Sequence, residues 1–315
     1  MPAPIRVPGK LILLGEHAVV YGVPALAVPV TNVYATAAFT PADQPFTLAL
    51  PDLNETHPLA ALPTDHPAAA AIHTTLAHLG QPAPAGTLTV RATIPLGGGL
   101  GSSAAISVAI IRALAAHFAT PLDDATVSAL AYETEKLHHG APSGIDNTVI
   151  AYARPVYFIR GLPIEILSVA MPFTLVIADT GIAASTKVAV SGVRQRYDAQ
   201  PDHFDMLFAR IAELAAEARA LIENGYPLML GPLLDENHSL LQEIGVSSHE
   251  LDTLVNAARN AGALGAKLSG GGLGGNMLAL TTPTDAGRIA AALTAAGAIR
   301  TIITTVPATG KASQP

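Results

Sequence analysis

The sequence predicts a protein of two closely joined domains that combines strands with helices. The chain has 315 residues, which is more than one typical domain needs. Alternating runs rich in β-branched residues, such as 87–94, are typical of strands, and long runs of helix formers, such as 104–118, are typical of helices. The segment 160–171 is the expected boundary region, and we assign residues 1–165 to the first domain and 166–315 to the second.

The first domain is expected to begin with strands joined by turns. These strands are expected at residues 10–14, 18–21, 25–28, 32–39 and 46–50. A helix is expected near 68–79 and a pair of strands at 149–159, and the second domain is expected to open with a strand at 173–179. Its later elements are expected as helices at 202–224, 234–241, 251–260 and 284–296 and as a strand at 299–306.

Composition limits the partners that the protein can have. Half of the residues are apolar, only 13% are charged, and the formal net charge is −7, which argues against a nucleic-acid or anionic-membrane partner. The absence of cysteine excludes disulfides, thiolate metal sites and cysteine nucleophiles. The first residues lack the apolar segment of a signal peptide, and the uncharged run 92–111 is broken by glycine and proline. We therefore expect a cytoplasmic protein without a membrane segment.

The most informative stretch is 94–106, with the sequence IPLGGGLGSSAAI. A strand, a glycine-rich turn and a helix N-terminus follow one another here. The unpaired N–H groups of the first helical turn would therefore point at a bound anion, and the helix dipole adds positive charge at the same place. Ser102 and Ser103 add hydroxyls that could hold a phosphate oxygen or a magnesium ion. The stretch predicts a phosphate-binding loop.

Three kinds of phosphate loop compete for this stretch, beside the plainer alternative of a glycine turn that packs a buried helix. A Walker loop is excluded because no lysine stands at the required place. A dinucleotide fingerprint fits Gly99–Ala104, but Asp123 and Asp124, which lie near the distance at which an acidic residue should close a strand, open a helix pattern instead. The third interpretation fits better, since Pro95–Ala105 resembles the second motif of the GHMP kinases (galacto-, homoserine, mevalonate and phosphomevalonate kinases). The resemblance assigns the phosphate-binding role to Pro95, Gly97, Gly98, Gly99, Leu100, Gly101, Ser102, Ser103 and Ala104.

A second resemblance lies near the N-terminus, in the segments 8–10 and 15–22. The sequence PGK followed by GEHAVVYG is similar to the first GHMP motif in its mevalonate-kinase form and departs from the galactokinase pattern. Lys10 on its own is equally well explained as a strand-end cation that points to solvent. His17, between Glu16 and an apolar run, is on its own better explained as a structural histidine, and the resemblance makes it a candidate for binding the substrate's carboxylate or hydroxyl.

A helix is expected from Thr120, with Pro121 at its first position, to about residue 139. Val127, Ala131 and Glu135 fall on one face, which we expect to turn inward together with Leu130 and Leu137, while Glu133 stays in solvent. A carboxylate on an inward face is unfavourable unless a cation or a metal ion pairs with it. Glu135 is therefore the better candidate for a ligand of a divalent ion.

A Gly/Pro turn then delivers Asp146 to the expected start of the next strand. An ordinary turn residue is the common alternative at such a place. However, the stretch 135–147, with Glu135 at one end and Asp146 near the other, resembles the segment between the metal-binding glutamate and the catalytic aspartate of mevalonate kinases.

Two further segments of the second domain resemble the same family. Residues 179–187 resemble the segment of the mevalonate-kinase branch that approaches the substrate, although a plain structural role explains Thr186 and Lys187 equally well. The third glycine cluster, 267–277, resembles the C-terminal GHMP motif, which packs against the phosphate loop. Leu273 departs from that motif, because a small or basic residue is common there. We also expect a capping box from Ser247 to Glu250 at the helix that follows.

The three motifs stand in the family's order and the resemblance covers nearly the whole chain. It implies an α+β fold: a two-domain GHMP kinase with a first domain like domain 2 of ribosomal protein S5 and a ferredoxin-like second domain, with the substrate cleft between them. It further implies ATP and Mg²⁺ as cofactors and phosphoryl transfer to the primary hydroxyl of (R)-mevalonate. In such transfers positioning and charge neutralisation supply most of the catalysis.

The resemblance also implies a role for each candidate residue. Asp146 orients the hydroxyl or takes its proton, and Lys10 steadies the transferring group beside it. Ser103 and Glu135 would coordinate magnesium. The residues implied for the acceptor are Glu16, His17, Gly144, Asp146 and Thr186. The implied partner is a small-molecule substrate, with no nucleic acid and no membrane, and a homodimer stays open.

Two alternatives stay open at this point. One is a neighbouring GHMP enzyme, such as a phosphomevalonate, mevalonate 3-, homoserine or sugar kinase; the related decarboxylases are disfavoured because they typically lack the lysine found at Lys10. The other is a non-catalytic sensor of a sugar or nucleotide. Lys10, Glu135 and Asp146 together argue against a sensor, which needs no metal ligand and base side by side.

Overall fold

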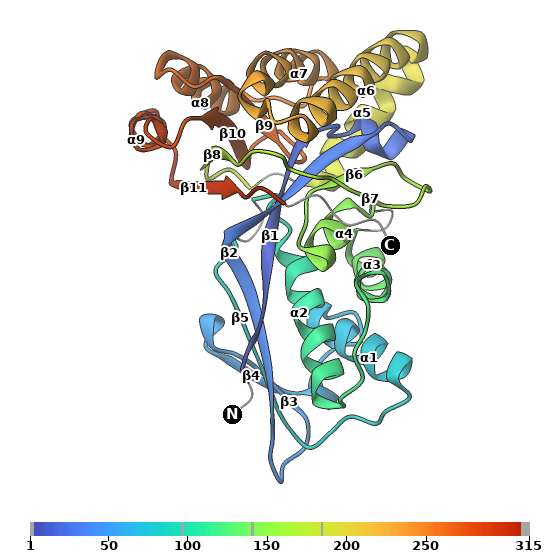
Figure 1. The fold of residues 1–315 in the computed structure, drawn as a ribbon. Coiled ribbons are helices and arrows are strands. Elements are labelled where there is room, and N and C mark those ends of the chain that lie inside the picture. The colour runs from blue at the N-terminus through green and yellow to red at the C-terminus, as the bar shows by residue number, and fades with distance from the viewer. Residues whose placement is uncertain (1–2, 96–97, 140–141, 184, 310–315) are drawn as a thin grey trace. The chain divides into compact units, whose positions relative to one another are not determined.

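The structure is a computed structural model that describes residues 3–95, 98–139, 142–183 and 185–309 (Figure 1). The chain divides into two compact units. The first unit is Met1–Lys10, Val33–Pro95 and Gly101–Ala153. The second unit is Leu11–Asn32, Leu96–Leu100 and Arg154–Pro315. The expected division between residues 165 and 166 stays a prediction.

The strands β1 (Ile5–Leu14) and β2 (Ala25–Pro41) each contribute to both units. In the first unit, residues 35–41 of β2 pair antiparallel with β5 (Gly86–Ala92), and β5 pairs in parallel with β3 (Thr47–Leu50). Strand β4 (Glu55–Pro58) pairs antiparallel with β3. In the second unit, residues 25–27 of β2 pair with β6 (Val156–Phe158), which also pairs with β7 (Glu165–Ile166).

The separate strands expected at 25–28 and 32–39 are one strand of 17 residues, so that prediction was wrong. Pro29 lies inside this strand, although proline cannot donate to a sheet ladder. In the structure Pro29 lies between the stretch of β2 that pairs with β6 and the stretch that pairs with β5. The chain stays extended through Pro29.

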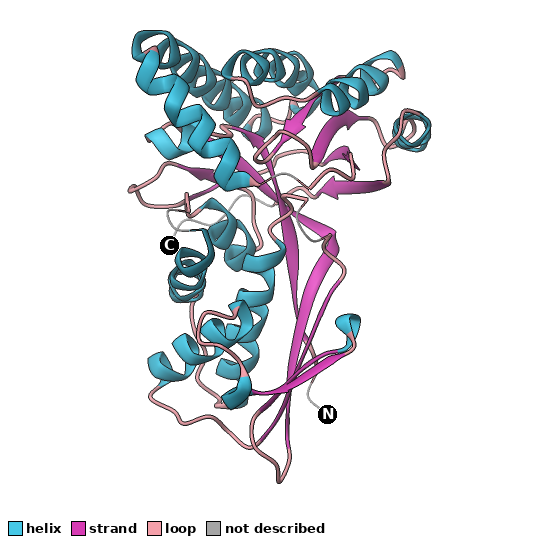
Figure 2. Ribbon diagram, turned by 180° about the vertical axis from the view of Figure 1, so that it is seen from behind, coloured by secondary structure: helices cyan, strands magenta, loops and turns pink. Residues whose placement is uncertain are grey.

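Four helices lie on one side of the strands in the first unit (Figure 2). They are α1 (Pro67–Leu79), α2 (Ser102–His117), α3 (Asp124–His139) and α4 (Ile145–Tyr152). Helix α3 begins at Asp124 and not at Pro121, because the Asp123 carboxylate accepts a hydrogen bond from the Thr126 N–H at 2.7 Å and caps the helix there. Short 3₁₀ turns lie at Ala18–Tyr21, Pro51–Leu53, Leu59–Ala61 and Pro227–Met229, the first of them where we expected a strand.

The strand pair expected at 149–159 was also wrong, since α4 occupies its first half. The residues Thr148, Val149 and Ile150 favour strands by their β-branched side chains, and tertiary packing overrides that preference. Val149 and Ile150 are buried in the first unit, and the Thr148 hydroxyl donates to the Gly144 carbonyl at 2.7 Å. Asp146 therefore lies in the first turn of a helix and not at the start of a strand.

The second unit contains a four-stranded antiparallel sheet in the order β11-β8-β10-β9. The strands are β8 (Phe173–Asp179), β9 (Gly265–Ser269), β10 (Asn276–Thr281) and β11 (Arg300–Val306). The helices are α5 (Thr186–Ala199), α6 (Pro201–Glu223), α7 (Leu230–Ile244), α8 (His249–Asn260) and α9 (Ala286–Ala295). The apolar spacing predicted for α6 is confirmed, because Phe204, Leu207, Phe208, Ile211 and Leu214 are all buried.

Strand β9 has two faces with different neighbours, and this difference positions part of the candidate site. Ala266 and Leu268 belong to the core that the sheet shares with α6, α7, α8 and α9. Lys267 and Ser269, which alternate with them, face the segment 11–32 of the same unit: Lys267 pairs with Glu16, and the Ser269 hydroxyl donates to the Ile12 carbonyl at 2.9 Å. Within the part of the chain that the structure describes, no helix has the length and apolar character to cross a membrane.

Candidate active site

The glycine-rich loop leads directly into the N-terminus of α2. Gly101 is the residue before the helix and has a φ of 75°, and Gly99 has a φ of 77°; both values lie in the left-handed region that glycine adopts readily. No side chain caps α2 at Gly101, so the first-turn N–H groups of Ser102, Ser103 and Ala104 can donate to a bound anion. Among the other predicted loop residues Pro95, Gly98 and Leu100 are buried, and Gly97 lies outside the described residues.

Glycine is required at position 101 because of its positive φ and also because there is no room for a Cβ atom. A Cβ atom there would lie 2.8 Å from Ile150 Cδ1 and 3.0 Å from Lys10 Cγ. The side chain of Lys10 thus passes directly beside the N-terminus of α2, and this close approach needs a residue without a Cβ.

Lys10 and Asp146 form an ion pair in the first unit. Lys10 Nζ lies 2.8 Å from Asp146 Oδ1; the lysine side chain is 4% exposed and the aspartate side chain 35%. Asp146 lies in the first turn of α4, where the helix dipole stabilises a carboxylate. The two residues predicted to be catalytic therefore lie together beside the start of α2, and the carboxylate is still open to solvent.

Ser103 and Glu135 form the second predicted pair of the first unit. The Ser103 hydroxyl donates to Glu135 Oε1 at 2.6 Å, so the first turn of α2 contacts the inner face of α3. The inward orientation of Val127, Leu130, Ala131 and Glu135 is confirmed, whereas Leu137 is 60% exposed and that prediction was wrong. Glu133 lies in solvent as expected and pairs with Lys136 at 2.6 Å.

The chemistry of the Ser103–Glu135 pair suits magnesium. Magnesium prefers hard oxygen ligands and is commonly held by one or two carboxylates together with substrate phosphates. A hydroxyl and a carboxylate next to an anion-binding helix terminus fit that description. Among the described residues, no group of three or more His, Asp or Glu side chains is arranged to hold a metal ion.

The third glycine cluster contacts the glycine-rich loop within the second unit. Asn276 donates its side-chain N–H to the Gly98 carbonyl, and Cβ atoms added to Gly270 and Gly275 would come within 4 Å of Gly99 and Gly98. The packing that the resemblance implied for this cluster is therefore present in the structure.

The acceptor candidates of the second unit lie around that same cluster. His17 Nε2 lies 3.0 Å from the Gly271 carbonyl, and burial lowers the pKa of the His17 imidazole to about 4. Thr186 opens α5 and is exposed, and a Cβ on Gly271 would approach its hydroxyl to 3.1 Å. Glu16 is buried and its Oε1 pairs with Lys267.

Two residues that the sequence did not single out for function belong to this account. Asn147 follows Asp146 and donates to the Ser128 carbonyl at 3.0 Å and to the Ser128 hydroxyl at 2.9 Å, which ties α4 to α3. Lys267 was regarded only as the first residue of the glycine cluster, but it is wholly buried and pairs with Glu16. The position of Asn147 next to Asp146 in the sequence could have indicated its role. No residue near Lys267 in the sequence indicates that it pairs with Glu16.

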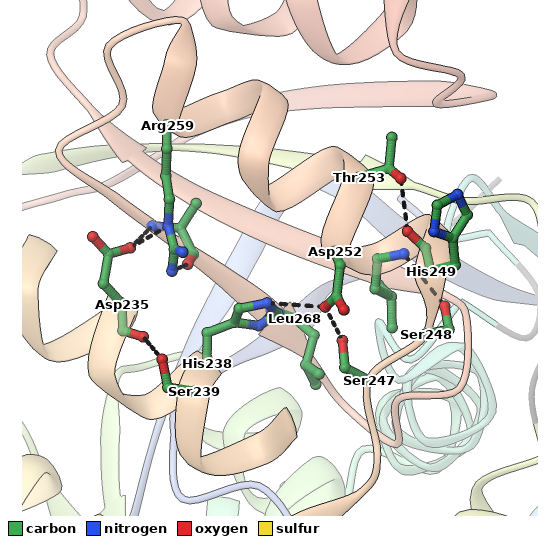
Figure 3. Close-up of polar contacts among 12 residues, drawn as sticks. Asp235, His238, Ser239, Ser247, Ser248, His249, Asp252, Thr253, Arg259 and Leu268 are labelled. Atoms are coloured by element: carbon green, nitrogen blue, oxygen red, sulfur yellow. Dashed lines mark hydrogen bonds and ion pairs between the residues drawn. The ribbon is translucent and has the colours of Figure 1, made fainter. Parts of the chain in front are cut away.

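A serine, an aspartate and a histidine also meet near β9, but not as a catalytic triad (Figure 3). The Ser247 hydroxyl donates to Asp252 at 2.5 Å and not to His238, and the His238 Nδ1 accepts from the Leu268 N–H at 3.3 Å. The neighbouring Ser248, and not Ser247 as expected, caps α8 by accepting from the Leu251 N–H. His238 is therefore not placed to take the Ser247 proton.

Comparisons with known proteins show the family of the chain. Two family models match the chain: the GHMP kinases N terminal domain at residues 67–154 and the GHMP kinases C terminal model at residues 218–299. A curated relative from Thermococcus sibiricus, named mevalonate kinase, is 35% identical over 309 residues, and the match covers 92% of each chain.

Solved structures show the same fold. The crystal structure of L. major mevalonate kinase in complex with R-mevalonate matches with a TM-score of 0.85 at 29% identity, covering 98% of this chain and 97% of that one. The Methanococcus jannaschii mevalonate kinase matches with a TM-score of 0.84 at 25% identity, covering 97% and 98%.

The chain therefore belongs to the GHMP kinases, and the expected two-domain fold of that family is confirmed. The curated relatives from Thermococcus sibiricus and Pyrococcus abyssi, 35% and 34% identical to this chain over 92% of its length, are both named mevalonate kinase. The two alternatives, another GHMP kinase and a non-catalytic sensor, are not favoured.

Proposed function

We propose that the protein transfers the γ-phosphoryl group of ATP to the primary hydroxyl of (R)-mevalonate, which gives 5-phosphomevalonate and ADP. The observation that carries the proposal is the 2.8 Å contact of Lys10 with Asp146, formed beside the helix terminus that follows the glycine-rich loop. A relative of known structure is described in complex with R-mevalonate, which supports the same acceptor.

The phosphates of ATP are proposed to lie on the loop and the first turn of α2. The residues proposed for this role are Pro95, Gly97, Gly98, Gly99, Leu100, Gly101, Ser102, Ser103 and Ala104. Backbone N–H groups at a helix N-terminus bind phosphate through hydrogen bonds and the helix dipole together. The glycines at 99 and 101 keep the backbone free of side-chain atoms where the phosphates approach.

Ser103 and Glu135 are proposed to hold Mg²⁺. When bound, magnesium offsets the negative charge of the phosphates during transfer. Glu135 is almost fully buried and is held by the Ser103 hydroxyl, so its carboxylate is already oriented toward the start of α2 before any ligand binds. Preorganised charge of this kind needs no rearrangement during the reaction.

Asp146 is proposed to orient the acceptor hydroxyl or to take its proton, and Lys10 to steady the transferring group. A carboxylate that is one-third exposed can reach a substrate, while its buried lysine partner keeps it in one position. Placing the hydroxyl in line accounts for much of the rate in phosphoryl transfer.

The residues proposed for acceptor binding are His17, Glu16, Gly144, Asp146 and Thr186. His17 is neutral at pH 7, because burial lowers its pKa to about 4. Glu16 is buried and contacts Lys267, so we propose that it affects acceptor binding indirectly, by positioning His17. The boundary at residue 165, the cytoplasmic location and a homodimer stay predictions.

Coupled ADP release with a panel of mevalonate, phosphomevalonate, homoserine and galactose tests the proposed function. We expect mevalonate to give the highest kcat/KM. ADP release with another alcohol but not with mevalonate would replace the proposed acceptor, and tight ATP binding without release on any alcohol would contradict a kinase activity.

A further inference from the structure

His17 is the centre of a strained three-residue turn. Its φ of 60° and ψ of −50° lie outside the left-handed helical region, and the Ala18 N–H donates to the Glu16 carbonyl at 2.6 Å, which closes a γ-turn of positive φ. This form of γ-turn is rare and strained for a residue with a side chain. Such conformations persist only where the surrounding structure enforces them.

Two contacts hold the turn, one on each of its first two residues. The Glu16 carboxylate pairs with the Lys267 ammonium, and both side chains are 0% exposed. The His17 Nε2 lies 3.0 Å from the Gly271 carbonyl. Both partners belong to the β9–glycine segment of the same unit, so one piece of the chain fixes the turn twice.

Strand β9 is itself fixed along both edges. One edge pairs with β10, with Lys267 opposite Leu278. On the other edge, the Ala266 N–H donates to Asp235 at 2.9 Å, the Ala266 carbonyl accepts from Arg259, and the Leu268 N–H donates to His238 (Figure 3). The N–H groups of both neighbours of Lys267 and the Ala266 carbonyl are thus hydrogen-bonded to side chains, which holds the lysine in place on β9.

The contact with the Gly271 carbonyl also defines the hydrogen-bonding state of the His17 imidazole. A carbonyl can only accept, so the His17 proton resides on Nε2, and Nδ1 carries the lone pair. Within the described residues Nδ1 is buried and has no hydrogen-bond partner. An unsatisfied buried acceptor of this kind is a place where a hydroxyl group of a ligand can donate.

We propose that Lys267 is a positioning residue for acceptor binding: its buried ion pair with Glu16 holds the strained turn that presents His17 Nδ1 as a hydrogen-bond acceptor for a substrate hydroxyl. The proposal rests on the proposed function for the identity of that substrate. The lysine contacts no substrate itself and acts through Glu16 and the turn.

The test uses the variants Lys267→Met and Lys267→Met/Glu16→Gln in the full chain. Removing the lysine alone takes away one half of a buried ion pair, so this variant should lose stability. The double variant contains no isolated charge and should regain stability in urea unfolding. We expect both variants to raise the KM for mevalonate by about tenfold or more, with the KM for ATP changed less than about twofold.

A matched control breaks an ion pair elsewhere in the same unit. Arg210→Met removes the 2.6 Å contact with Glu236 between α6 and α7 and should leave the KM for mevalonate unchanged. A double variant that regains both stability and the wild-type KM for mevalonate would overturn the proposal, because the ion pair would then matter for stability alone.

Nitrogen-15 spectra of the His17 ring give a readout that does not depend on activity. A His17→Gln variant assigns the signal. We expect the wild type to show the Nε2–H form alone and the double variant to show a mixture of both tautomers. A single tautomer in the double variant would overturn the proposal, whether or not mevalonate is the substrate. A wild-type protein that does not phosphorylate mevalonate would contradict only the proposed function.

Discussion

Asn147 donates two hydrogen bonds to Ser128, one to its carbonyl at 3.0 Å and one to its hydroxyl at 2.9 Å. Both residues are about 95% buried. The contact joins α4, which carries Asp146, to α3, which carries Glu135. The residue that fixes the proposed catalytic aspartate is therefore its immediate neighbour in the sequence.

Replacing Asn147 with leucine should weaken both stability and catalysis. The substitution removes both hydrogen bonds to Ser128, which costs about 1–3 kcal/mol, and the loosened α4 should lower kcat about tenfold. Urea unfolding and ADP release measure the two effects. Asn224→Ala is the control, because this asparagine is exposed and its side chain donates to the Ala220 carbonyl of the helix that it follows, at 2.8 Å. An unchanged kcat in Asn147→Leu would show that the contact does not position Asp146.

Replacing Glu135 with glutamine should raise the Mg²⁺ concentration needed for half-maximal activity by about tenfold or more, because a neutral amide is a weaker ligand for a hard cation. The control is Glu133→Gln, two positions away on the exposed side of the same helix. A titration of activity against Mg²⁺ separates the two variants. Identical Mg²⁺ curves for the two variants would contradict the proposed role of Glu135 as a magnesium ligand.

Replacing Gly101 with alanine should lower the free energy of unfolding by more than the cost of its positive φ alone. The φ cost of a left-handed residue is about 1–2 kcal/mol. Gly161 has a φ of 84° and open space around it, so Gly161→Ala should show that cost alone. The added contact with Ile150 and Lys10 should make Gly101→Ala less stable than this control and reduce kcat. Equal losses of stability and normal activity would contradict the packing argument.

Stability should fall as the pH drops from about 6.5 toward 4. Burial lowers the pKa of both His17 and His238 to about 4, while the unfolded chain keeps a histidine pKa near 6.5. Between these values the unfolded state binds more protons, so acid favours unfolding. Urea unfolding at several pH values should show a smaller slope in His238→Gln than in the wild type. Superimposable slopes would mean that His238 does not contribute.

Much of the site could be predicted from local sequence. The glycine-rich sequence correctly predicted a turn followed by a helix. The spacing of Val127, Ala131 and Glu135 correctly predicted that the Glu135 carboxylate lies on the inner face of α3. These features depend on residues a few positions apart, where helix periodicity and glycine conformation decide the outcome.

The features that were missed depend on contacts between distant residues. Helix α4 was taken for a strand because Thr148, Val149 and Ile150 favour strands locally, and packing against α3 decided otherwise. Glu16 and Lys267 are separated by 251 positions, and the sequence around either residue does not predict their ion pair. The strained turn at His17 likewise depends on that distant partner.

We propose that the Lys10–Asp146 pair carries out phosphoryl transfer to mevalonate, and the kcat of Asp146→Asn tests this proposal most directly. ADP release is measured with saturating ATP and mevalonate, together with circular dichroism and urea unfolding of the same sample. The pair predicts a kcat lower by roughly two orders of magnitude or more in a protein that still folds. A folded Asp146→Asn protein that turns over mevalonate at near the wild-type rate would contradict the claim.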